Sequence, residues 1–153
     1  MSDLPFSTDE YRARLAKTRV EMAARELDAI FVTDPSNMAW LTGYDGWSFY
    51  VHQGVLLTLE GQPVWWGRAM DTVGAQRTTY LSGDDIAGYD DTYVQNPAKH
   101  PMEDLAKLIA SRGLETSHIG LEMDNYYFTA YSGASGHSFR QHPATDSGVS
   151  GHL

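Results

Sequence analysis

The sequence predicts an α/β domain in which helices flank a mixed β-sheet. Segments with helical periodicity alternate with short apolar runs that are rich in β-branched residues. Two of these runs, 51–60 and 63–66, flank a Gly61-Gln62 turn, which is the pattern of an antiparallel hairpin. A hairpin within an alternating order of helices and strands makes the sheet mixed rather than purely parallel.

The first helix is predicted from its N-terminal cap and its apolar stripe. Ser7 and Glu10 have capping-box spacing, in which Ser7 caps the helix and Glu10 reaches back to the free N–H. The helix should continue to about Arg25, where the periodicity of the sequence changes. Residues at steps of three to four form a stripe that should face the core: Tyr11, Leu15, Thr18 and Met22.

A strand and a short helix should follow. The apolar run 28–33 is rich in β-branched residues and predicts a strand that is buried on both faces. Asp34 is a suitable cap for the next helix, and Pro35 favours its first position. That helix should cover 37–42 and stop at Gly43 in a left-handed conformation.

The remaining elements follow the hairpin. Residues 69–80 should be helical, and the irregular segment 82–101 should hold one short strand at 86–89. An amphipathic helix is predicted over 101–112, and a second buried strand over 118–123. The inward face of the helix should be formed by Met102, Leu105, Leu108 and Ile109.

The domain organisation follows from length and composition. The chain has 153 residues and no cysteine, so one core without disulfides or thiolate zinc is expected. Residues 132–153 consist largely of Gly, Ser, His and other small residues, which bury too little apolar surface to offset their ordering entropy. We therefore expect a domain over 1–131 and a tail over 132–153 that is disordered or non-native.

Charge and hydropathy exclude several classes of partner. The formal net charge is −9, and residues 26–67 contain no Lys or Arg, which argues against a nucleic-acid partner. The N-terminus lacks a signal-peptide pattern, and no apolar run is long enough to cross a membrane. A cytoplasmic protein without a membrane partner is therefore expected.

No complete active site can be recognised. The six histidines lack metal-ligand spacing and clustered carboxylates, so no metal or other cofactor is expected in this domain. The chain also lacks the G-x-S-x-G nucleophile elbow and both glycine-rich phosphate-binding patterns. No residue of this chain is therefore assigned a catalytic role.

The aromatic residues between Trp40 and Tyr50 need a separate explanation. Trp40 and Leu41, on the short helix, should pack beneath the sheet. The stretch 43–50 contains two glycines and an Asp among its rings, so it should form a loop whose rings lie at the surface. Such rings form either a lid on the core or a contact surface for a ligand or partner, and the pattern leaves both open.

Four segments resemble the N-terminal domain of the creatinase, prolidase and aminopeptidase P family. They are E-Y-x-x-R-L-x-x-x-R-x-x-M at 10–22, L-D-A-I-F-V-T-D-P-S-N-M at 27–38, W-L-T-G-Y at 40–44 and I-G-L-E-M-D at 119–124. The resemblance covers about residues 5–131. Within the family, T-D-P-S-N-M followed by G-Y-D-G-W-S-F-Y-V-H-Q is most similar to the ectoine hydrolase branch, which opens the cyclic amidine of ectoine.

The resemblance implies a fold with a ribonuclease H-like motif and a two-domain subunit. The catalytic domain, which has the pita-bread fold, is absent here, and its metal content is unknown. In dimeric members the small domain lends side chains from this loop to the active site of the partner subunit. By this resemblance the residues that contact a small-molecule substrate in trans are Trp47, Phe49, Tyr50 and His52.

One position departs from the creatinase pattern. Phe49 matches an aromatic residue of creatinase, but Val51 stands where creatinase has the Arg that meets the substrate carboxylate. The neighbouring His52 could partly take over the contact that this Arg makes with the carboxylate. The resemblance thus favours a stacked, flat amidinium over a carboxylate held by this loop.

Three functions remain in competition. The first is an accessory domain of a homodimeric C–N hydrolase, similar to ectoine hydrolase or creatinase or to an Xaa-Pro peptidase, that is not catalytic alone. The second is a stand-alone module that binds a small solute. The third is a purely structural dimerisation domain.

Overall fold

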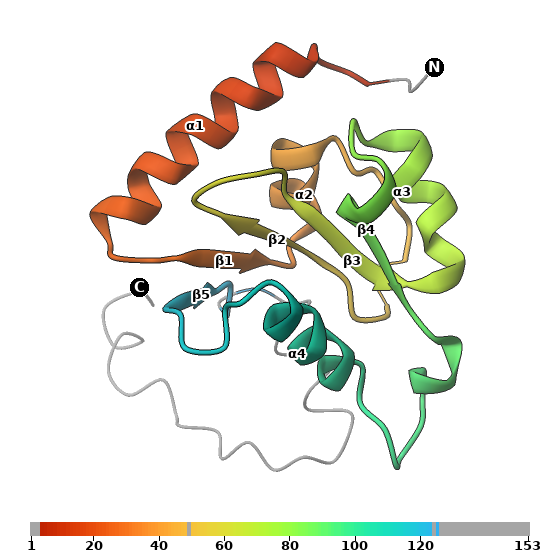
Figure 1. The fold of residues 1–153 in the computed structure, drawn as a ribbon. Coiled ribbons are helices and arrows are strands. Elements are labelled where there is room, and N and C mark those ends of the chain that lie inside the picture. The colour runs from red at the N-terminus through yellow and green to blue at the C-terminus, as the bar shows by residue number, and fades with distance from the viewer. Residues whose placement is uncertain (1–3, 49, 124, 126–153) are drawn as a thin grey trace, which may run out of the picture.

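The computed structural model describes residues 4–48, 50–123 and 125. Helices lie on both faces of one five-stranded sheet, with α1, α2 and α3 on one face and α4 on the other (Figure 1). The helices are α1 (Thr8–Ala24), α2 (Pro35–Thr42), α3 (Thr72–Thr78) and α4 (Pro101–Ser111). The strands are β1 (Ala29–Val32), β2 (Gly54–Thr58), β3 (Val64–Arg68), β4 (Ile86–Tyr89) and β5 (Ile119–Leu121).

The sheet is mixed, which confirms the predicted class. Its strand order is β4-β3-β2-β1-β5. β2 is antiparallel to both β1 and β3, whereas β4 is parallel to β3 and β5 is parallel to β1. The β2–β3 hairpin pairs Val55 with Trp65 around a turn that includes Gly61 at positive φ. The predicted strand 51–60 is shorter than expected, because residues 51–53 belong to the preceding loop.

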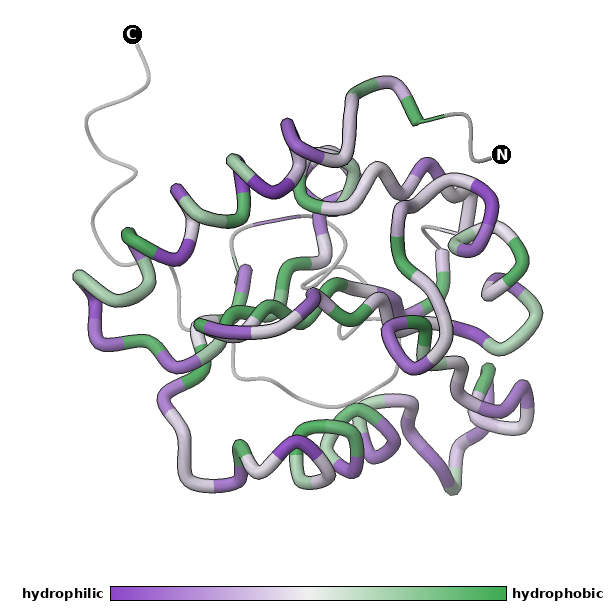
Figure 2. The backbone as a smooth tube through the Cα atoms, turned by 45° about the horizontal axis from the view of Figure 1, so that its top comes forward, coloured by the Kyte–Doolittle hydropathy of each residue, from purple (hydrophilic) through white to green (hydrophobic). Residues whose placement is uncertain are grey.

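Each face of the sheet has its own apolar cluster. Successive side chains of a strand point to opposite faces, so Trp65 packs with residues of α1, α2 and α3 while Trp66 packs with residues of α4. The tube in Figure 2 alternates between hydrophilic and hydrophobic residues along α1 and α4, as expected for surface helices. β2 and β3 are consequently buried on both faces, whereas β1, for which 28–33 predicted the same, is fully buried on one face and half-buried at Ile30 and Val32 on the other.

The start of α1 differs in one detail from the predicted capping box. Ser7 Oγ accepts a hydrogen bond from the backbone N–H of Glu10, as expected. The Glu10 carboxylate, however, accepts from Arg14 Nε at 3.0 Å, because a charged guanidinium is a stronger donor than a backbone N–H. A reciprocal capping box is found instead at α4, between His100 and Glu103, where the sequence analysis did not predict one.

Two predictions of burial are wrong. Trp40 lies on the outer side of α2 with 43% of its surface exposed, whereas Leu41 is buried as expected. A short helix can bury only one side, and here that side carries Met38 and Leu41. The predicted buried strand 118–123 is an edge strand, with Leu121 and Met123 exposed, because β5 pairs only with β1 among the described strands.

Some expectations fall outside the described residues. Phe49, the last residues of the proposed 1–131 domain and the 132–153 tail all lie there. Within the described part of the chain, no helix is long and apolar enough to cross a lipid bilayer.

Candidate functional site

The aromatic loop, defined here as residues 43–53, connects α2 to β2 at one end of the sheet. β1, β3, β4 and β5 end there and the antiparallel β2 begins there, so the loop lies at the end of the sheet where four strands have their carboxyl ends. Gly43 starts the loop with φ +84 and closes α2 by donating its N–H to the Ala39 carbonyl. A Cβ at this position would lie 2.9 Å from the Thr78 carbonyl oxygen, so the sharp exit from α2 requires glycine.

Tyr44 is a buried anchor of this loop, and the prediction that its ring lies at the surface is wrong. Its hydroxyl donates a hydrogen bond to Gln53 Oε1 at 2.9 Å, and its ring centroid lies 5.2 Å from that of Trp65. Burial raises the pKa of Tyr44, so the phenol keeps its proton. At Gly46 a Cβ would lie 1.9 Å from the Tyr44 oxygen, so the chain folds directly over this ring.

The other end of the loop is also buried. Val51, His52 and Gln53 are all buried, and the Val51 N–H donates to the Ser48 carbonyl in a turn. The Tyr89 hydroxyl donates to the His52 carbonyl at 2.9 Å, which fastens the loop to β4. The aromatic loop is thus held to the core at both ends.

His52 packs inside the domain. Its ring centroid lies 4.8 Å from that of His100, the cap of α4. Burial, with the neighbouring His100, lowers the pKa of His52 from 6.5 to about 4, so the imidazole is neutral at pH 7. This environment shows that His52 supports the loop, and contact with a substrate stays a prediction.

Two rings of the aromatic loop project outward. Trp47 is 83% exposed and Tyr50 is 57% exposed, whereas Ser48 between them is buried. Phe49, the third ring expected in the contact surface, lies outside the described residues. Rigid ends and exposed aromatic rings are the arrangement expected of a contact surface rather than a core lid.

A charged pair next to this loop was missed by the sequence analysis. Arg68, at the end of β3, forms an ion pair with Asp91, just after β4. The hydrogen bond that Arg68 Nε donates to the Asp91 carboxylate raises the pKa of Arg68, and Asp71 and Tyr50 add to this effect. The sequence does indicate this pair, because Arg68 is a charged residue directly after the apolar residues of β3, at the end of the strand that faces the loop.

The site contains groups for binding, and its described residues hold no metal cluster. No three His, Asp or Glu side chains of the described chain lie close enough together to hold a metal ion. Exposed aromatic rings can stack on a flat ligand and attract a cation through their π-faces. The described loop can therefore form the wall of a pocket.

Comparison with known proteins identifies the family to which this domain belongs. The family model for the creatinase/prolidase N-terminal domain matches residues 14–140, and the chain belongs to this family. A solved proline dipeptidase from Streptococcus pneumoniae superposes with a TM-score of 0.60 at 20% identity, over 79% of this chain and 82% of that one. At this identity the likeness concerns the fold alone.

Two curated relatives are more similar in sequence. An ectoine hydrolase from Halomonas elongata is 59% identical over 128 residues, which is 83% of this chain and 32% of the relative. An uncharacterized hydrolase/peptidase from Sinorhizobium fredii, y4tM, is 37% identical over 131 residues, or 85% of this chain and 33% of the relative. The chain thus spans about a third of the length of these relatives.

Proposed function

We propose that this chain is the N-terminal accessory domain of a C–N hydrolase of the ectoine hydrolase type, and that it is not catalytic alone. In this proposal the reactive groups, and any metal, belong to a C-terminal catalytic domain. The aromatic loop completes the substrate pocket of the partner subunit in a cytoplasmic homodimer. Support comes from the 59% identity to an ectoine hydrolase of which the chain spans 32%.

The observation that carries the proposal is the exposure of Trp47 and Tyr50 on an anchored loop. Trp47 is 83% exposed, so most of its apolar area stays in water, where its burial by a ligand would be favourable. The flanking residues Tyr44 and His52 are buried, so the backbone holds the exposed rings in place. A preorganised ring loses little conformational entropy when a ligand binds, which favours a role in binding.

The chemistry of these rings suits the proposed substrate class. An amidinium is flat and cationic, so it can stack on Trp47 or Tyr50 and gain cation–π attraction in the same contact. The Arg68–Asp91 pair beside Tyr50 is already internally neutralised. The loop therefore offers two aromatic faces to a cationic ring, and the guanidinium of Arg68, which is paired with Asp91, does not repel that ring as an unpaired charge would.

A chimera tests the proposal directly. Residues 1–131 of this chain would replace the matching third of the Halomonas elongata ectoine hydrolase, and ectoine hydrolysis would be measured. We expect Trp47→Ala and Tyr50→Ala each to lower kcat/KM by about 10-fold, the equivalent of about 1.4 kcal/mol of lost stacking. Val20→Ala is the control, because Val20 is an exposed apolar residue on α1, and its kinetic constants should not change.

The same experiments separate the competing functions. If both loop variants keep the kinetic constants of the parent chimera, the domain is structural and the loop does not meet substrate. The isolated 153-residue chain should neither hydrolyse ectoine nor bind it with micromolar affinity through the aromatic loop in calorimetry. Turnover by the isolated chain would reject an accessory role, and tight binding that Trp47→Ala abolishes would favour the stand-alone module.

A further inference from the structure

A groove of about 650 Å³ lies between the start of α1, the outer side of α2 and the end of α3. Its lining includes the rings of Phe6, Tyr11 and Trp40, together with Arg14, Asp45 and Thr78. Pockets for small ligands usually have volumes of about 300–1,000 Å³ and combine apolar walls with a few polar groups. The groove fits that description, and no residue of α1 has a part in the function proposed above.

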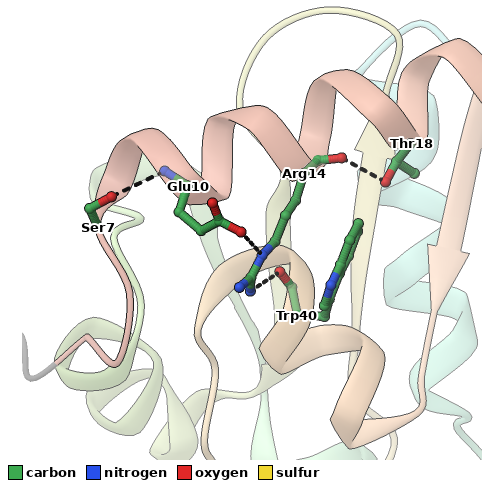
Figure 3. Close-up of polar contacts among 5 residues, drawn as sticks. All are labelled: Ser7, Glu10, Arg14, Thr18 and Trp40. Carbon is green, nitrogen blue, oxygen red and sulfur yellow. Dashed lines mark hydrogen bonds and ion pairs between the residues drawn. The ribbon is translucent and has the colours of Figure 1, made fainter.

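Arg14 is the central polar group of this groove. Its side chain is only 10% exposed, although it carries a permanent charge. Nε donates to Glu10 Oε1 at 3.0 Å, and Nη1 donates to the Trp40 carbonyl at 3.2 Å (Figure 3). Nη2 has no hydrogen-bond partner among the described residues and is not a fully buried atom, so it keeps donors that a ligand in the groove can reach.

Tyr11 has the same property. This residue is fully buried one helical turn before Arg14, and its hydroxyl has no hydrogen-bond partner within the described structure. Buried polar groups are normally paired, so an orphaned hydroxyl needs an explanation. Tyr11 and Arg14 both line the groove, and both retain a donor that lacks an acceptor.

Aromatic walls surround these donors. The Arg14 guanidinium carbon lies 4.2 Å from the ring centroid of Phe6 and 5.6 Å from that of Trp40. Phe6 remains 50% exposed and Trp40 43% exposed, so each ring still offers apolar surface to a ligand. A purely structural role of Arg14, which joins α1 to the end of α2 through Nη1, accounts for neither the orphaned hydroxyl nor the exposed rings.

The charges of the groove restrict the ligand further. The charge of Arg14 is already offset by Glu10, and the groove also contains the exposed carboxylate of Asp45. The whole chain has a net charge of −9, which disfavours a simple anion. A ligand that carries both a carboxylate and a cationic nitrogen satisfies the donors without adding net negative charge.

We infer that this groove binds a small zwitterion of the amino-acid class. Its carboxylate accepts a hydrogen bond from Arg14 Nη2 and, after a rotation of the Tyr11 ring that brings its buried hydroxyl to the groove, a second one from that hydroxyl. Its apolar body lies against Phe6 and Trp40, and its cationic nitrogen is attracted by Asp45. This inference does not depend on the enzyme activity proposed above. It assigns a binding function to the N-terminal half of α1.

NMR titration of the 153-residue chain with three matched six-membered rings tests the inference. The probes are pipecolate, a zwitterion; cyclohexanecarboxylate, an anion; and piperidine, a cation. We expect saturable shifts of backbone amides near Tyr11, Trp40 and Asp45 with pipecolate, and at least 5-fold weaker binding of the other two probes. Absence of saturable shifts in this region, or equal affinity for all three rings, would overturn the inference.

Two tyrosine substitutions provide a matched pair that tests the donors. Tyr11→Phe removes a hydroxyl without a partner, so it should weaken pipecolate binding about 5-fold while the melting temperature stays the same or rises. Tyr80→Phe removes a hydroxyl that donates to the Leu41 carbonyl, so it should lower the melting temperature and leave pipecolate affinity unchanged. Pipecolate affinity that is unchanged by Tyr11→Phe would refute the assigned contact.

Discussion

Aromatic residues occupy opposite environments in β3 and in the aromatic loop. Trp65 and Trp66 are completely buried, whereas Trp47 and Tyr50 are largely exposed. β3 lies between β2 and β4 with helices on both faces, so both orientations of its side chains point into packed clusters. The loop is packed at both ends and at Ser48, and its side chains at Trp47 and Tyr50 point away from that packing. Residue type therefore does not decide burial here; the layers around the backbone do.

Trp66 is also held by specific contacts. Trp66 Nε1 donates to Asp104 Oδ1 at 2.9 Å, and the Trp66 ring centroid lies 4.8 Å from that of Tyr89. Its polar atom and its apolar surface are therefore both satisfied within the fold. This difference from the loop predicts separate effects on stability and on function.

The largest effect is expected for the buried tryptophan. Trp66→Ala would leave a cavity beneath α4 and should lower the free energy of unfolding by about 3–5 kcal/mol. Trp47→Ala, its matched control, should change it by less than about 0.5 kcal/mol. Urea denaturation measures both. Similar losses for the two variants would show that Trp47 is packed and would contradict the comparison.

The buried end of the loop should make stability depend on pH. Because the pKa of His52 is about 4 in the folded chain and 6.5 as a free side chain, the unfolded chain takes up a proton first as pH falls. Stability is therefore full above about pH 6.5 and should decrease by about 2–3 kcal/mol as pH falls towards 4. Urea denaturation at pH 7, 5.5 and 4.5 measures this change.

Two histidine variants isolate the origin of that pH dependence. His52→Gln should flatten the profile between pH 6.5 and 4, since no imidazole remains to take up the proton in the unfolded chain. His118→Gln, at an exposed position, should retain the profile of the parent. An unchanged profile in His52→Gln would mean that other groups cause it.

The smallest changes in stability are expected for alanine substitutions at two glycines. Gly46→Ala places a methyl group against the Tyr44 ring, so it should lower the free energy of unfolding by about 1–3 kcal/mol, depending on how far the loop can shift. Gly74→Ala, in α3, meets no atom within 4 Å and should stabilise the chain by about 0.5–1 kcal/mol. Thermal unfolding distinguishes the two signs. A stabilised Gly46→Ala variant would show that the loop does not fold over Tyr44.

Local patterns were sufficient for most of the architecture. The Ser7 cap, the Gly43 stop, the hairpin around Gly61 and the short strand 86–89 were all predicted and confirmed. The cap, the stop and the hairpin depend on hydrogen bonds or backbone preferences of neighbouring residues, which the sequence displays directly. The burial of Arg14 was not predicted, although its position indicates it, because Arg14 adjoins Leu15 on the stripe that begins at Tyr11.

The sequence of this chain specifies the type and order of its helices and strands and the family it belongs to, because both are encoded in short contiguous patterns. Burial of Tyr44 against Trp65, of His52 against His100 and of Arg14 beneath Trp40 depends on residues that are far apart in the chain. The exposure of Trp40 likewise depends on which side of α2 packs against the sheet. Only the packing of helices on the sheet brings such partners together, and that packing determines which aromatic rings remain available for binding.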